Sequence, residues 1–211
     1  MIKYKIIGKY KDGIARVINR DGLYGFINSE GDETCPCKYI HSTRFSEGRA
    51  LVKDATLMYG FIDQQGAEVV ACRYNQAGEF QEGRAWVSNE EGSGFINLQG
   101  EEVIPLKYRR ADSFNAEKAI VQNNDELWGV IDLQGKEIVP CRYKQILKFE
   151  EGMARVENDE WLWGYINLQG KEVIKCNYTY ASDFKNGVAE VQTLGEYDFK
   201  IDITVTETPY E

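Results

Sequence analysis

Few side chains in this sequence combine a reactive type with the spacing that catalysis or metal binding requires. A single histidine, His41, supports neither a multi-histidine metal site nor a histidine-based triad with a recurring partner. The Cys35-Pro36-Cys37 segment lacks the common C-x-x-C spacing, and no second pair completes a tetrahedral zinc site. The carboxylate pairs Glu90-Glu91 and Glu150-Glu151 lie in polar breaks, where solvated loops are the simpler interpretation. We therefore predict no catalytic residue, no metal site and no cofactor.

The segments that carry these residues repeat along the chain. The pair Tyr24-Gly25 recurs at intervals of 34 or 35 residues, as Tyr59-Gly60, Ser93-Gly94, Trp128-Gly129 and Trp163-Gly164. A period in this range indicates a repeat protein, so a residue type shared by the copies is first interpreted as structural. Four of the five cysteines share one repeat position, which Leu106 fills in another copy: Cys37, Cys72, Cys141 and Cys176. We interpret them as reduced, semi-buried apolar residues.

Each copy predicts short strands and no helix. In the fifth copy, residues 153–156 alternate with a period of two, and residues 161–166 are rich in aromatic and β-branched types. Residues 167–170 form a turn with an Asx residue first and glycine fourth, and a third strand starts at Glu172. Residues 178–184 are predicted as a short fourth strand or a crossover.

The glycine of the recurring pair lies inside a predicted strand. Glycine in a strand usually marks a bulge or the close approach of another group to the backbone. We expect an aromatic ring of the neighbouring copy to lie over this glycine. The recurring tyrosines and phenylalanines would then pack between copies.

We predict one domain over residues 1–211, with copies at about 4–38, 39–73, 74–107, 108–142, 143–177 and 178–211, the last divergent. Two all-β architectures of antiparallel strands fit six copies. The order of elements favours a six-bladed β-propeller-like ring. An open β-repeat arc, or solenoid, is the alternative, because about 35 residues is short beside the ~40–45 of WD-type blades. The divergent sixth copy suits a cap of an arc, or a blade completed by residues 1–7.

The repeat unit resembles the WG-repeat family, also called KWG repeats. The closest match runs from Trp128-Gly129 through Val130, Ile131 and Asp132 to Tyr143, and the likeness covers nearly the whole chain. The resemblance implies a β-repeat fold and a bacterial source. The family has no agreed catalytic activity, so it supplies no active-site residues.

The net charge of the chain limits the classes of partner that it can bind. The formal net charge is −9, which disfavours nucleic acid and anionic membranes and is compatible with a basic protein partner. No apolar run approaches the ~18 residues that span a bilayer, and the first residues lack the apolar region of a signal peptide. We expect a cytoplasmic monomer that binds a protein.

Variation within the repeat indicates where a partner binds. The position before the valine of the G-x-A-x-V block holds Arg16, Leu51, Trp86, Ile120, Arg155 and Glu190. Leu51, Trp86 and Ile120 are candidates for an exposed apolar binding strip with Arg155 at its charged margin, although packing of this face under the next strand layer is slightly favoured. Trp161 is a further candidate, because the other copies have Gly22, Leu57, Glu91 and Glu126 there.

These observations favour a non-enzymatic protein–protein interaction scaffold that presents a variable repeat surface. An immunity-type inhibitor of a partner toxin is one alternative. A small-ligand binder or an enzyme that uses a central channel is the other.

Overall fold

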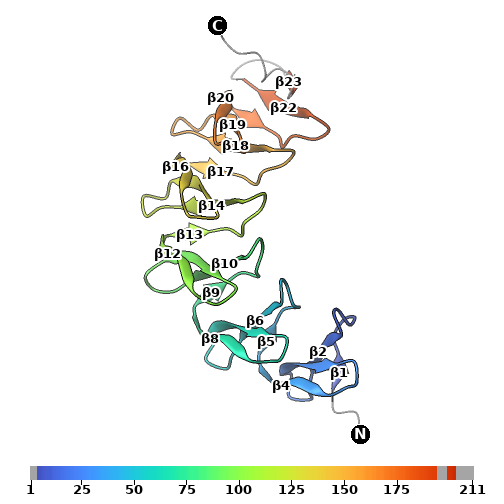
Figure 1. The fold of residues 1–211 in the computed structure, drawn as a ribbon. Helices are drawn as coiled ribbons and strands as arrows, with labels where there is room; N and C mark the ends of the chain where they lie inside the picture. The colour runs from blue at the N-terminus through green and yellow to red at the C-terminus, as the bar shows by residue number, and fades with distance from the viewer. Residues whose placement is uncertain (1–3, 194–198, 203–211) are drawn as a thin grey trace. The chain divides into compact units, whose positions relative to one another are not determined.

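The computed structural model describes residues 4–193 and 199–202, and these residues form six antiparallel β-sheets and no helix. Five sheets have four strands and the sixth has three (Figure 1). The chain separates into two compact units, Met1–Lys107 with Ser113–Asn115 and Tyr108–Asp112 with Ala116–Glu211. The predicted all-β class and antiparallel repeat are confirmed. The choice between ring and arc stays a prediction, as does the single domain.

Each sheet is a meander in which strands adjacent in the sequence pair with one another. The first sheet consists of β1 (Lys5–Ile6), β2 (Ile14–Ile18), β3 (Tyr24–Asn28) and β4 (Glu33–Tyr39). The second consists of β5 (His41–Ser42), β6 (Arg49–Lys53), β7 (Tyr59–Asp63) and β8 (Glu68–Tyr74). The third consists of β9 (Gln76–Ala77), β10 (Arg84–Ser88), β11 (Ser93–Asn97) and β12 (Glu102–Tyr108).

The remaining sheets follow the same order of elements. The fourth consists of β13 (Arg110–Ala111), β14 (Lys118–Gln122), β15 (Trp128–Asp132) and β16 (Glu137–Tyr143). The fifth consists of β17 (Gln145–Ile146), β18 (Met153–Glu157), β19 (Trp163–Asn167) and β20 (Glu172–Tyr178). The sixth consists of β21 (Tyr180–Ala181), β22 (Val188–Gln192) and β23 (Phe199–Asp202). The recurring tyrosine therefore ends the last strand of a sheet, and the next sheet begins two residues later.

Two kinds of turn shape each sheet. Before β6, Ser46 and Arg49 exchange two backbone hydrogen bonds around Glu47 and Gly48, whose φ angles are 51° and 75°. Both φ angles are positive, as a type I′ hairpin turn requires. After β7, the Asp63 carboxylate accepts hydrogen bonds from the backbone N–H groups of residues 65 and 67, at 3.0 and 2.9 Å. This is the Asx turn that the sequence predicts.

The glycine of the recurring pair lies opposite a β-bulge. Between β7 and β8, Tyr59 pairs with Tyr74 while Phe61 pairs with Val70, so β8 has extra residues opposite Gly60. A Cβ added to Gly60 would lie 2.5 Å from the Val70 carbonyl oxygen. The expectation that a neighbouring aromatic ring covers this glycine is therefore wrong. The backbone of the partner strand occupies that space, because the bulge brings it close.

Aromatic rings do pack between sheets, as the sequence predicts. In the second and third sheets, Phe61 and Phe80 meet edge to face with ring centroids 4.9 Å apart. The corresponding centroid distances are 4.8 Å for Phe26–Phe45, 4.7 Å for Phe95–Phe114 and 4.9 Å for Tyr165–Phe184. Aromatic pairs in such arrangements contribute about 0.5–1.5 kcal/mol beyond their buried area.

The core lies between successive sheets. Ala50 and Val52 of β6 pack in a cluster with Phe26 of the first sheet. Leu51 of the same strand packs with Ala85 and Val87 of the third sheet. Because successive side chains of a strand point to opposite faces, β6 buries both of its faces. The second sheet therefore depends on a neighbour on each side.

Polar contacts also join successive sheets. The Tyr39 hydroxyl donates to Glu68 at 3.0 Å, and the Lys38 ammonium donates to the same carboxylate at 2.8 Å. In the second unit, the Tyr143 hydroxyl donates to Glu172 at 2.8 Å. Tyr39 and Tyr143 therefore each end one sheet and tie it to the last strand of the next.

None of the five cysteines forms a disulfide, in keeping with the reduced thiols that the sequence predicts. Cys35 is buried in the core cluster of Phe26, and burial raises the pKa of its thiol to about 11. Burial raises the pKa values of the Cys72 and Cys176 thiols to about 11 as well. Thiols with raised pKa values and little exposure are inert, so these side chains act as small apolar residues.

Candidate functional site

The predicted apolar strip is not exposed at two of its members. Leu51 and Ile120 each retain 6% of their accessible surface, and each belongs to a core cluster with residues of the following sheet. The prediction that they form an exposed binding strip is therefore wrong. Both side chains face the next sheet, which covers them. Leu51 and Ile120 are therefore packing residues of the core.

The arginines at the same strip position also reach toward the next sheet. Arg155 donates to the Ala181 carbonyl at 2.6 Å and to the Asp183 carboxylate at 2.8 Å. Its guanidinium carbon lies 5.6 Å from the centre of the Trp163 ring. Arg155 thus joins the fifth and sixth sheets, and these contacts give it a structural role besides the predicted binding role. Arg16 donates to the Ser42 carbonyl in the same way.

Trp86 is half-buried and lies against the backbone of its own sheet. A Cβ added to Gly78 would lie 2.1 Å from the Trp86 Nε1, so the indole occupies the space that a side chain would fill. The indole borders an open cavity of about 350 Å³ lined by Lys53, Tyr59, Asn75, Gln76, Ala77 and Trp86. Trp86 is therefore both a packing residue and a wall of a surface hollow.

Trp161 is the exposed member of the predicted set. It keeps 67% of its accessible surface and has a φ of 64°. It lies at the tip of the hairpin that joins β18 and β19, in a turn whose Asn158 side chain accepts from the N–H groups of Glu160 and Leu162 at 3.0 and 2.9 Å. Bulky residues seldom adopt positive φ, so this indole is held in a strained conformation.

The second sheet has an apolar residue in the same situation that sequence reasoning missed. Leu57 is 60% exposed with a φ of 68° at the tip between β6 and β7. The signal was present in the sequence, because Gly22 occupies this position in the first copy. The third copy is one residue shorter, and there the positive φ falls on Gly92 rather than on Glu91. Gly92, and not Glu91, is therefore the residue equivalent to Trp161.

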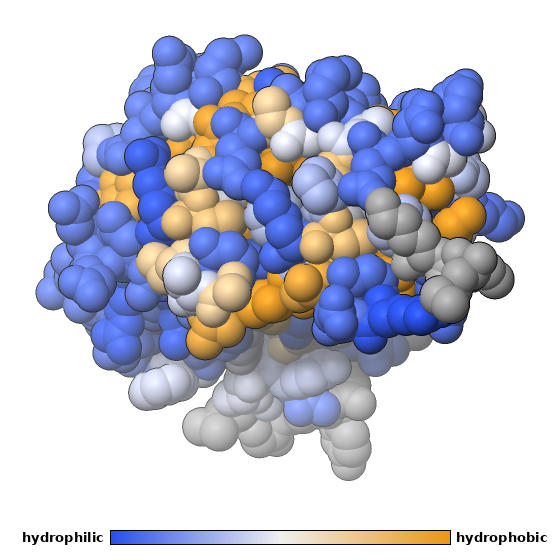
Figure 2. All heavy atoms as spheres, turned by 90° about the horizontal axis from the view of Figure 1, so that it is seen from below, coloured by the Kyte–Doolittle hydropathy of each residue, from blue (hydrophilic) through white to orange (hydrophobic). Residues whose placement is uncertain are grey.

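Exposure alone does not single out a binding residue. On the face drawn in Figure 2, apolar patches reach the surface between hydrophilic side chains. Apolar atoms contribute more than half of the surface of most folded proteins. Among the exposed large apolar residues that the structure describes, Trp161 and Leu57 are the two that also have a positive φ.

Other reactive side chains have structural surroundings. His41 is exposed, with its ring centroid 6.3 Å from that of Tyr24. Glu151 accepts hydrogen bonds from the backbone N–H groups of Asn186 and Gly187, both at 2.8 Å. Within residues 4–193 and 199–202, no group of three or more His, Cys, Asp or Glu residues could hold a metal ion. The same residues contain no helix that could cross a membrane.

The sheets and their turns define a protein of the β-repeat class, whose four-stranded antiparallel unit is that of a propeller blade. The sequence model of the WG containing repeat family matches residues 24–54, 59–91, 94–126, 128–160 and 163–197. The chain therefore belongs to the WG containing repeat family, and the resemblance inferred from the sequence is confirmed. No curated protein matches the chain.

Several solved structures are similar to this chain at low identity. The computationally designed Ika8 protein is 13% identical, with a TM-score of 0.47 over 92% of this chain and 70% of its own. BamB from Moraxella catarrhalis is 12% identical, with a TM-score of 0.41 over 87% and 65%. The WD40 β-propeller domain of Doa1 is 11% identical, with a TM-score of 0.36 over 89% and 74%. Likenesses of this degree carry no functional argument.

Proposed function

We propose that this chain is a non-enzymatic scaffold that binds a protein partner through the hairpin tip at Trp161. The observation that carries the proposal is an indole that is 67% exposed at a φ of 64°. A left-handed backbone costs an ordinary residue about 1–2 kcal/mol. Because the Trp161 indole is so exposed, its packing within the chain offsets little of this conformational cost. Strained residues of this kind concentrate at functional sites.

The local structure suits an interface anchor. The Asn158 hydrogen bonds fix the turn before any partner arrives, so binding orders little backbone. Tryptophan is enriched among the residues that contribute most to binding energy at protein interfaces. The net charge of −9 favours a partner with a basic surface around the apolar contact.

The compartment is part of the same proposal. None of the five cysteines forms a disulfide, which suits a reducing compartment such as the cytoplasm, where disulfides are rare. A regular core that presents variable turn residues suits a binding scaffold. The proposed protein is therefore a cytoplasmic binding module.

The test replaces Trp161 with glycine, which accepts the positive φ. Trp161→Gly and the matched control Glu126→Gly change equivalent turn positions, since Glu126 has a φ of 64°. A protein captured by the wild type is purified, and its affinity is measured by isothermal titration. We expect Trp161→Gly to weaken binding at least about tenfold and Glu126→Gly to leave it unchanged.

The stability of both variants is measured by urea unfolding. Glycine relieves the strain at either position, so neither variant is expected to be less stable than the wild type by more than about 0.5 kcal/mol. If all of the captured proteins bind Trp161→Gly as tightly as they bind the wild type, the proposal is contradicted. Trp86→Ala is a less direct probe, because it also removes packing against Gly78.

A further inference from the structure

Four cationic side chains converge on a pocket between the first and second sheets of the first unit. Lys9 and Lys11 come from the segment between β1 and β2, Arg16 from β2, and Arg44 from the segment between β5 and β6. The same pocket is lined by Ile7, Ile14, Phe26 and Phe45. This cluster, here called the cationic pocket, belongs to a chain whose net charge is −9.

The charges of the cationic pocket are not balanced by the residues that the structure describes. Across the described residues, no carboxylate lies within ion-pair distance of any of the four cations. Lys11 donates to the Phe45 carbonyl at 3.5 Å, and Arg16 donates to the Ser42 carbonyl. Like charges that share a pocket repel one another, and a bound anion relieves that repulsion.

One donor in the pocket is buried and unsatisfied. The Arg16 Nε exposes almost no surface and has no hydrogen-bond acceptor among the described residues. A buried N–H group without an acceptor is costly, so such groups usually mark the place of a missing partner. Arg16 lines the pocket, so its guanidinium keeps donor capacity that the described residues do not use.

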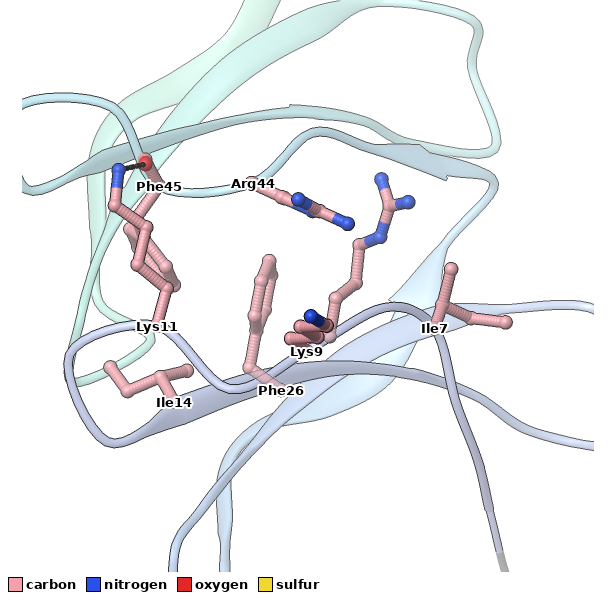
Figure 3. A pocket seen from close by; sticks show the side chains of 8 residues that line it. Ile7, Lys9, Lys11, Ile14, Phe26, Arg44 and Phe45 are labelled. Carbon is pink, nitrogen blue, oxygen red and sulfur yellow. Dashed lines mark hydrogen bonds between the residues drawn. The ribbon is translucent and has the colours of Figure 1, made fainter.

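The base of the pocket is apolar and leaves little room. Phe26 is fully buried, and its ring centroid lies 4.8 Å from that of Phe45. Figure 3 shows Lys11 on one side of the Phe26 ring and Lys9 on the other, with Arg44 extending above it. The cavity is partly open to solvent and measures about 20 Å³, which is close to the minimum that a single water needs. It therefore has room for one oxygen atom of a ligand, and the rest of the ligand lies outside it.

We propose that the cationic pocket binds the carboxylate of an acidic side chain that a protein partner inserts between Arg44 and the lysines. Guanidinium and ammonium groups form charge-assisted hydrogen bonds with a carboxylate, and Ile7 and Phe45 contact apolar residues beside it. Nucleic acid is disfavoured as the source of the anion, because the chain as a whole carries a net charge of −9. The inference rests on the proposed function, since the ligand belongs to a protein.

The test uses defined peptides and needs no natural partner. Fluorescein-labelled peptides of alternating leucine and glutamate, or of alternating leucine and glutamine, are titrated with the full chain and followed by anisotropy. Arg44→Ala removes one exposed cation from the pocket. Lys144→Ala removes one exposed cation from the second unit and serves as the matched control.

We expect the glutamate peptide to bind Arg44→Ala about tenfold more weakly than the wild type, and Lys144→Ala within about twofold. The glutamine peptide is expected to bind the wild type at least about tenfold more weakly than the glutamate peptide. Equal affinity of the two variants, or of the two peptides, overturns the proposal. Tighter, Arg44-dependent binding of a labelled RNA oligonucleotide overturns it in favour of a phosphate site.

Trp161→Gly in the same titration separates this inference from the proposed function. That variant is expected to bind the glutamate peptide like the wild type, because Trp161 belongs to the second unit and is not among the residues that line the cationic pocket. A loss of peptide binding in Trp161→Gly would contradict the assignment of the carboxylate to this pocket.

Discussion

At the scale of single residues, two glycines of the second sheet have different reasons to be glycine. Gly60 has no free space, because an added Cβ would lie 2.5 Å from the Val70 oxygen and 2.8 Å from the Cys72 nitrogen. Gly48 has open space around it and a φ of 75°. The first glycine is required by the close approach of a strand backbone, and the second by the conformation of a turn.

The two glycines predict different costs for the same substitution. Gly60→Ala forces the β7 and β8 backbones apart and is expected to lower the free energy of unfolding by about 2–3 kcal/mol. Gly48→Ala introduces strain alone and is expected to cost about 1 kcal/mol. Urea unfolding measures both. Equal costs would show that the close contact opposite Gly60 relaxes without penalty.

The buried thiols predict low chemical reactivity. The pKa values of Cys72 and Cys176 are raised to about 11, so at pH 8 about one thiol in a thousand is ionised. We expect iodoacetamide to modify both residues at least about a hundredfold more slowly in the native protein than in guanidinium chloride. Peptide mass spectrometry measures each site. Rapid native modification of either cysteine would contradict the assignment of these residues as inert.

At the scale of elements, carboxylates tie successive sheets together within each unit. Glu47 of the second sheet accepts hydrogen bonds from the backbone N–H groups of Glu82 and Gly83 in the third, both at 2.8 Å. Glu151 repeats this arrangement with Asn186 and Gly187. The hydrogen bond from Lys38, followed by that from Tyr39, lowers the pKa of Glu68. The contacts of Glu68 with Lys38 and Tyr39 are therefore made by its ionised carboxylate.

The lowered pKa of Glu68 predicts how stability depends on pH. Its contribution is fully present above the unfolded pKa of about 4.3, and it is lost as the pH falls through the lower folded pKa. Glu68→Gln is therefore expected to be less stable than the wild type at pH 7 and to approach it at pH 3. Urea midpoints at the two pH values measure the difference.

Glu79→Gln is the matched control for this experiment. Glu79 is an exposed carboxylate of the same unit, outside the hydrogen bonds that join the sheets. Its substitution is expected to change the urea midpoint little at either pH. A gap between Glu68→Gln and the wild type that stays constant from pH 7 to pH 3 would contradict the linkage.

The strands and turns could be predicted from the sequence because their signals are local. Alternation in the G-x-A-x-V block indicates β18, and an Asx residue followed by glycine indicates the turn at Asp63. The bulge opposite Gly60 could not be predicted, because it depends on how many residues of β8 lie between two paired positions. A glycine in a strand predicts that some group lies close to its backbone, but it does not identify that group as the partner strand rather than an aromatic ring.

The candidate site was predicted only in part for a related reason. Alternation places Leu51 and Arg16 on the same face of their strands, but burial of that face depends on the stacking of the next sheet. Leu51 is covered there, so it belongs to the core. Trp161 could be found from the sequence, because the equivalent position in the first copy is Gly22, which is typical of a turn. A side chain at the tip of a turn is exposed.

At the scale of the whole molecule, the interior interfaces within each unit belong to two successive sheets. Phe61 packs with Phe80 and other residues of the third sheet, and Tyr165 packs with Phe184 and donates to the Ser182 carbonyl at 2.7 Å in the second unit. Where contacts join only neighbouring repeats, stability is close to a sum of repeat and interface terms. Damage at one interface is then expected to stay near that interface.

Amide hydrogen exchange tests this expectation with a matched pair of variants. Phe61→Leu keeps most of the side-chain volume and is expected to lower the opening free energy of β6, β7, β10 and β11 by about 1 kcal/mol. The amides of β18 and β19 are expected to change by less than about 0.3 kcal/mol, since they belong to the second unit. Tyr165→Leu is expected to give the reverse pattern, with a larger loss because a hydrogen bond is also removed. Equal loss of protection in both units for either variant would show that the chain unfolds as one cooperative body, which would support the single domain predicted from the continuous repeat.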